Sequence, residues 1–87
     1  MPSRMTVIGV MLAFMHRSPA CSGNVWSDGD RLESYRVLLG RWKRGATSPC
    51  VQAITRKDLS SCGASRTVAK HHGWYKELVN FHKNNVN

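Results

Sequence analysis

The chain has 87 residues, and its thirteen Lys and Arg against five Asp and Glu give a formal net charge of +8. This length allows one small domain with a thin core, which disfavours a self-contained multi-step enzyme. Seven Gly and three Pro exclude a fibrous repeat. No apolar run reaches the roughly 18–20 residues needed to cross a bilayer, so we expect no transmembrane span.

The positive charge is unevenly distributed along the chain. Residues 1–30 hold two basic and two acidic residues, whereas residues 31–87 hold eleven basic and three acidic ones. A concentration of positive charge on a small domain attracts a polyanion such as nucleic acid, anionic lipid or an acidic protein. We therefore divide the chain into an apolar N-terminal segment and loop (1–30), a basic domain (31–83) and a fraying tail (84–87).

An apolar run at residues 6–15 allows three interpretations. Arg4 precedes it, and the small residues Ser18 and Ala20 follow it, a pattern that resembles a secretory signal peptide. The absence of acidic residues before Asp28 also suits an organellar presequence. The third interpretation is a buried helix or strand inside the domain.

The next segments predict a loop and then a helix. Residues 18–30 are rich in Ser, Pro, Gly, Asn and Asp, which favours a loop. Asp30 fits a helix N-cap and Glu33 the third helical position, so that both acids face one side of the first turn. Spacings of three, four and three then predict a helix over 31–44 with one apolar face, formed by Leu32, Tyr35, Leu39 and Trp42.

Three further short helices complete the expected fold. Ser48-Pro49 is typical of a helix start, and the apolar stripe continues through Ser60. Helices are then predicted over 64–72 and 74–83, separated by Gly73. Because no alternating strand pattern with a hairpin signal is recognised, the predicted fold is all-α, a small bundle of short helices.

Cysteine and histidine spacing suggests no metal centre. The three cysteines are an odd count, which favours reduced, buried thiols, with a Cys50–Cys62 bridge as the alternative. Neither this pair nor its combination with His71, His72 and His82 has the Cys-x₂₋₄-Cys spacing of a structural zinc site.

Four blocks, in the same order along the chain, resemble the ribonuclease III domain. Ala13-Phe14-Met15-His16-Arg17-Ser18-Pro19-Ala20 is similar to the first motif of that family, and Asp30-Arg31-Leu32-Glu33 to the start of its signature. Ser48-Pro49 with Arg56 and Leu59 resembles a block of Dicer-type domains, and residues 67–76 resemble a later stretch. The resemblance implies an all-helical fold and binding of double-stranded RNA.

The same resemblance implies that catalysis is lost. The position of a metal-binding Asp of the family falls on Val37, and its second acidic pair has no counterpart. Glu33 is the one matching metal ligand and residual catalytic candidate, with Asp30 as a weak second ligand. Two-metal hydrolysis needs several carboxylates. We therefore predict a degenerate, non-catalytic copy without a cofactor, in which Mg²⁺ would act only if a partner chain supplied the missing acids.

The sequence thus predicts an intracellular (cytoplasmic, nuclear or mitochondrial) RNA-binding protein, with a partner protein or a homodimer also considered. The candidate RNA-binding residues are basic and lie after residue 30: Arg31, Arg36, Arg41, Lys43, Arg44, Arg56, Lys57, Lys70 and Lys76. One alternative is a secreted basic peptide precursor cleaved after Ala20 and after Arg44, where Arg-Trp-Lys-Arg resembles a convertase site. Another is a helix-turn-helix DNA-binding protein built from the two helices around Gly73.

Overall fold

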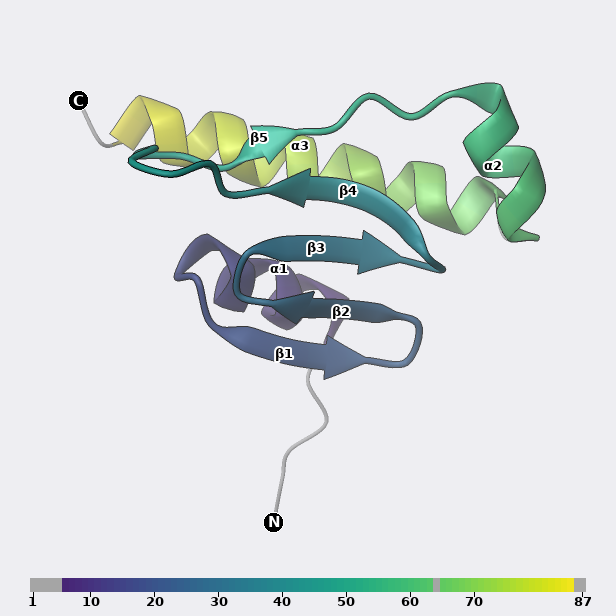
Figure 1. Cartoon of the computed structure of the whole chain (residues 1–87), viewed down its shortest axis with the longest axis horizontal. Helices are drawn as coiled ribbons and strands as arrows, with labels where there is room; N and C mark the ends of the chain where they lie inside the picture. Colours follow the sequence, from purple (N-terminus) through teal and green to yellow (C-terminus); the bar gives the residue numbers. More distant parts are fainter. Residues whose placement is uncertain (1–5, 64, 86–87) are drawn as a thin grey trace, which may run out of the picture.

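The computed structural model describes residues 6–63 and 65–85, apart from the side chains of residues 61 and 62. A helix is followed by five strands and two helices (Figure 1): α1 (Val7–Met15), β1 (Pro19–Ser22), β2 (Val25–Asp28), β3 (Arg31–Ser34), β4 (Val37–Arg41), β5 (Cys50–Val51), α2 (Arg56–Cys62) and α3 (Ser65–Asn85). The strands form one antiparallel sheet in the order β1-β2-β3-β4-β5. The fold is α+β, and the predicted all-α bundle is wrong.

The largest error concerns residues 31–44, which form the β3–β4 hairpin and not a helix. Side chains alternate along β3, where Leu32 and Ser34 are fully buried and Arg31 is exposed. The two-residue connection Tyr35-Arg36 has φ values of 50° and 68°, as a type I′ hairpin turn requires. This turn was not recognised from the sequence because Asn and Gly usually occupy it.

A second hairpin occupies the predicted loop at residues 18–30. Val25 and Ser27 of β2 are buried, while Asp28 at its end is exposed, so this short strand also alternates. β1 pairs with β2 over its whole length, from Pro19 opposite Asp28 to Ser22 opposite Val25. β2 and β3 pair in turn across the boundary drawn between residues 30 and 31, so the sheet joins the two segments.

The apolar N-terminal run forms helix α1, which confirms its interpretation as a buried helix. The Thr6 side chain caps the helix by accepting a hydrogen bond from the Gly9 N–H at 3.0 Å. Val10, Met11 and Phe14 are fully buried and belong to the hydrophobic core. Cleavage after Ala20 would therefore remove three core side chains from this fold.

Helix α3 runs without interruption from Ser65 to Asn85 and includes Gly73. The predicted pair of helices with a turn at Gly73 is wrong, and with it the helix-turn-helix arrangement. A single glycine weakens a helix by only about 1 kcal/mol, and here Val68, Tyr75 and Val79 anchor both halves in the core. Of the expected fraying tail, residues 86–87 lie outside the described residues.

The predicted helix over residues 48–60 begins later than expected. Pro49 is fully buried in the connection before β5, and the helix α2 starts after Thr55. Thr55 and Asp58 form a reciprocal capping box: the Thr55 hydroxyl accepts from the Asp58 N–H, and the Asp58 carboxylate accepts from the Thr55 N–H. A better cap, seven residues on, therefore replaces the Ser48-Pro49 start.

Helices α1 and α3 lie on the same side of the sheet, behind it in Figure 1. α1 packs against β1, β2 and β3, and α3 packs against β4 and β5. At the contact with α3, the Tyr75 hydroxyl donates to the Cys50 carbonyl at 2.6 Å and fills the space above Gly40, where any Cβ would clash. The opposite face of β1–β3 carries no helix of the described chain (Figure 1), which leaves its outward side chains accessible.

The cysteines and the expected absence of a membrane span can also be compared with the structure. Cys21 is exposed and Cys50 half-buried, and both are free thiols, so the expectation of three buried thiols is wrong for Cys21. The side chain of Cys62 lies outside the described ones. Within residues 6–63 and 65–85, no helix is both long and apolar enough to cross a bilayer.

Candidate nucleic-acid interface

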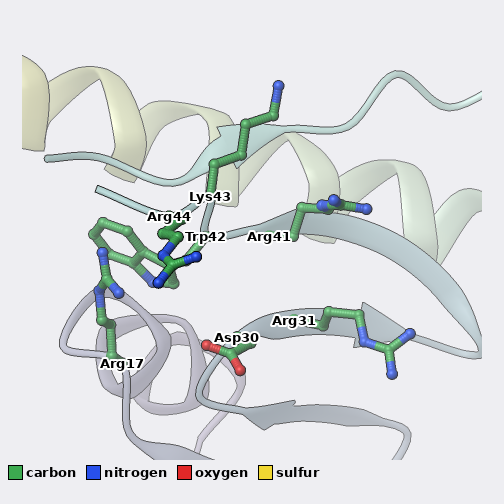
Figure 2. Close-up of a pocket in the computed structure, with 7 residues that line it drawn as sticks. All are labelled: Arg17, Asp30, Arg31, Arg41, Trp42, Lys43 and Arg44. Atoms are coloured by element: carbon green, nitrogen blue, oxygen red, sulfur yellow. The ribbon is translucent and has the colours of Figure 1, made fainter. Parts of the chain in front are cut away.

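A surface pocket of about 510 Å³ opens at the end of the sheet where α1, the β2–β3 turn and the end of β4 meet (Figure 2). Five of its seven lining residues are basic, and the others are one acid and one tryptophan: Arg17, Arg31, Arg41, Lys43, Arg44, Asp30 and Trp42. We call the five basic residues the basic end surface. They come from three segments of the sequence, at residues 17, 31 and 41–44, which the fold brings together.

Arg17 reaches this pocket from a strained backbone position. Its φ is 58°, in the left-handed region, directly after the C-terminus of α1. The Arg17 N–H donates to the Phe14 carbonyl and the Ser18 N–H to the Ala13 carbonyl, which is the Schellman pattern of helix ends. Glycine is the usual residue there, because the left-handed conformation costs other residues about 1–2 kcal/mol.

Contacts of the Arg17 side chain offset this strain. Its guanidinium carbon lies 4.3 Å from the ring centroid of Trp42, and one of its N–H groups donates to the Ala46 carbonyl at 3.1 Å. The Trp42 indole N–H in turn donates to the Phe14 carbonyl at 2.7 Å. Figure 2 shows Arg17 lying against Trp42, an arrangement that holds a guanidinium at the pocket wall.

Gly29 makes room for the Arg17 backbone. Its φ is +97°, and a Cβ at this position would lie 2.8 Å from the Arg17 carbonyl oxygen. The β2–β3 turn can approach the end of α1 only because residue 29 has no side chain. The next residue also contacts the end of β4, since the Asp30 carbonyl accepts a hydrogen bond from the backbone N–H of Trp42 at 2.8 Å. The turn, the end of α1 and the end of β4 are therefore fixed together.

Arg31 and Arg41 stand directly opposite each other on β3 and β4. Like charges in this cross-strand position destabilise a sheet. Among the described residues, Asp28 is the acid that forms an ion pair with either: its carboxylate lies 3.9 Å from the Arg31 Nε, and the side chains of Arg31 and Asp28 are 57% and 43% exposed. In the described part of the chain, Arg41 has no ion-pair partner. The two guanidiniums thus leave positive charge that the protein does not neutralise.

Asp28, and not Asp30, is the acid whose side chain accepts backbone hydrogen bonds at the β2–β3 turn. Its Oδ1 accepts from the backbone N–H groups of Asp30 and Arg31, each at 2.8 Å. These hydrogen bonds, the one from Arg31 first, hold the pKa of Asp28 below its usual value. The prediction that Asp30 caps a helix over 31–44 is wrong because a strand begins there.

The predicted metal pair Asp30 and Glu33 does not share a face. Residues three apart adjoin on a helix but point to opposite sides of a strand. Glu33 faces outward, paired with Trp26 and Leu38, whereas Asp30 lies in the turn at the pocket. Among the side chains that the structure describes, which do not include that of Cys62, no group of three His, Cys, Asp or Glu is close enough to hold a metal ion.

The structure brings four of the nine predicted RNA-binding residues together at the basic end surface: Arg31, Arg41, Lys43 and Arg44. The other five lie elsewhere. Arg36 lines a smaller pocket of about 210 Å³ beside the β3–β4 turn, and Arg56 and Lys57 open α2. Lys70 lies 5.1 Å from the Trp74 ring centroid on α3, and Lys76 is exposed further along that helix.

Sequence reasoning missed Arg17, the fifth member of the surface. It lies in the segment whose net charge is zero, so a count of charge along the chain gave it no weight. Nothing local in the sequence marks its left-handed backbone, because that position usually takes glycine. The basic run at residues 41–44 was a usable signal for the surface, and Gly29 signalled a close approach of some backbone.

One buried polar pair lies apart from this surface. The Ser34 hydroxyl and the His71 Nδ1 are 2.8 Å apart, linking β3 to α3, and both residues are buried. Burial, and to a smaller degree the Lys70 charge, lowers the pKa of His71. The pair links β3 of the sheet to α3.

Comparisons with protein-family models, with curated proteins and with solved structures gave no match. The ribonuclease III resemblance therefore stays a prediction from the residues alone. The all-helical fold that it implied is wrong, since its signature block, residues 30–33, enters strand β3. The function must be argued from the surface itself.

Proposed function

We propose that this protein binds RNA through the phosphates, using the basic end surface. The observation that carries the proposal is the Arg31–Arg41 pair, two like charges held directly opposite each other beside three further cations. Such an arrangement costs folding free energy unless a polyanion neutralises it. Guanidinium groups bind phosphate oxygens through two parallel hydrogen bonds, so closely spaced arginines suit a phosphate backbone.

The shape of this end of the molecule favours RNA over double-helical DNA. Adjacent strands are spaced about 4.8 Å apart, so β1–β4 form a surface about 14 Å wide. The major groove of B-DNA, about 12 Å wide, accepts a helix or a two-stranded ribbon. The basic residues lie at the end and on the open face of a broader sheet, and no described helix projects from them.

The test is the salt dependence of RNA binding, measured by fluorescence anisotropy with a labelled RNA. Log affinity should fall linearly with log salt, because each neutralised phosphate releases counterions. Arg41→Gln should weaken binding and reduce the magnitude of the slope by about 1. Arg56 is an exposed arginine on α2, so Arg56→Gln is the matched control. It should change the affinity and the salt slope less than Arg41→Gln does.

Three results would contradict the proposal: no binding at about 50 mM salt, a flat salt response, or equal effects of Arg41→Gln and Arg56→Gln. Equal affinity for RNA and duplex DNA of the same length would exclude the RNA preference. The RNA should also stay intact with Mg²⁺, because Asp30 and Glu33 do not form a metal pair. Gel electrophoresis of the incubated RNA checks this expectation.

A further inference from the structure

Trp26 differs from the other two tryptophans in its surroundings. Trp42 contacts Arg17 and Phe14, and Trp74 contacts His71 and Lys70. Trp26 makes no ring contact, cation–π contact or side-chain hydrogen bond within the described part of the chain. It is half-buried in β2, on the face of the sheet that no helix covers (Figure 1).

The strand register places a defined set of side chains around Trp26. Cys21 of β1 pairs with it on one side, Glu33 of β3 on the other, and Leu38 of β4 pairs with Glu33. Because paired residues point to the same face, these four side chains form a row across the open sheet. The row is an aromatic and aliphatic surface that contains one carboxylate.

Cations border this row. Arg31 lies two residues before Glu33 on β3, a distance of about 6.8 Å along a strand, and Arg41 of β4 is paired with Arg31. Figure 2 shows both arginine side chains extending away from Trp42 and along their strands. A base lying on Trp26 would therefore have guanidiniums within reach of its own phosphate. Asp28 contacts Arg31 only weakly, at 3.9 Å.

We infer that the open sheet face binds single-stranded RNA, with a base stacked on Trp26 and its phosphate held by Arg31 and Arg41. This inference rests on the proposed function and specifies its ligand. A duplex hides the faces of its bases, whereas single strands expose them for stacking on aromatic side chains. The bound RNA strand then continues from Arg31 and Arg41 into the pocket beside Trp42, which the same two arginines line.

Glu33 gives this surface a base preference. A carboxylate beside the stacked base repels phosphate, which keeps the backbone on the arginine side. It also accepts hydrogen bonds from exocyclic amino groups, as Glu does from cytosine N4. Uracil has no amino group, so the row favours cytosine over uracil.

The experiment measures anisotropy of fluorescein-labelled single-stranded oligocytidine, oligouridine and a duplex RNA of the same length. The wild-type protein should bind oligocytidine more tightly than either of the others. Trp26→Leu keeps an apolar side chain but removes the π face, and it should weaken binding to oligocytidine about five-fold or more. Trp26→Phe should restore part of the loss, and duplex affinity should be unchanged in both variants.

Thermal melts of the variants establish that each is folded. Glu33→Ala should abolish the preference for oligocytidine over oligouridine. If Trp26→Leu binds oligocytidine like wild type while Arg41→Gln binds weakly, this inference is wrong and the proposed function stands. If neither substitution weakens binding, both are wrong. Tighter binding of the duplex than of oligocytidine would also overturn the inference.

Discussion

Replacing Arg17 by Ala and by Gly separates the strain at this position from the contacts of its side chain. The stacking on Trp42 is worth about 0.5–1 kcal/mol at an exposed site, and the hydrogen bond to Ala46 about 0.5–1.5 kcal/mol. Arg17→Ala loses both contacts and keeps the strained backbone, so its free energy of unfolding should fall by about 1–2.5 kcal/mol.

Arg17→Gly loses the same contacts but relieves a left-handed conformation that costs about 1–2 kcal/mol. Because glycine has greater conformational freedom in the unfolded chain, folding of this variant costs about 0.5–1 kcal/mol more, which partly offsets the gain. Taking the middle of each range, the Gly variant should therefore be more stable than the Ala variant by about 0.75 kcal/mol. Urea denaturation of both proteins, compared at equal m values, measures this difference.

An Ala variant as stable as the Gly variant, or more so, would refute the argument, because it would mean that residue 17 is not held in the left-handed region. The RNA affinities provide a second comparison. Both variants should bind RNA more weakly than wild type and to a similar extent, since both lack the guanidinium. A Gly variant with full affinity would remove Arg17 from the basic end surface.

Three further predictions follow from the described contacts. Leu39→Ala should cost about 2–4 kcal/mol in urea denaturation, because this side chain is fully buried, and a silent result would exclude it from the core. Asp28→Ala should cost about 0.5–2 kcal/mol through the loss of two accepted hydrogen bonds, whereas Asp30→Ala should cost much less. Burial lowers the pKa of His71 in the folded protein, so at acidic pH the unfolded chain binds more protons than the folded one. Stability should therefore fall as the pH drops below about 6.5. His71→Leu removes this titrating group and should flatten the dependence of the melting temperature on pH.

Some features of this protein were predictable because they depend on local sequence. The apolar run at residues 6–15 has no charge to place in water, so a buried helix was one of the expected outcomes. The helices predicted over 64–72 and 74–83 coincide with helix α3 (Ser65–Asn85), although Gly73 does not end the helix. The basic run at 41–44 and Arg31 were recognised from their charge alone, and the structure places them at one pocket.

The sheet could not be predicted in this way because strand pairing depends on partners distant in the sequence. Leu32, Tyr35 and Leu39 fit the spacing of a helix, but Leu32 and Ser34 also fit the alternation of a strand. The pairing of β3 with β2 and β4 decides between them by burying Leu32 and Leu39 under α1 and α3. A non-local arrangement of hydrogen bonds thus overrides a local periodicity.

The same tertiary decision determines the candidate site. A helix over 31–44 would have placed Asp30 and Glu33 together as a metal pair, whereas the strand separates them and sets Arg31 opposite Arg41. Arg17 joins the surface only because Gly29 lets the β2–β3 turn approach the end of α1. The sequence determined that the chain is basic and that its N-terminal run is apolar. Only the pairing of strands decided where the charges meet, because side-chain direction in a strand changes at every residue.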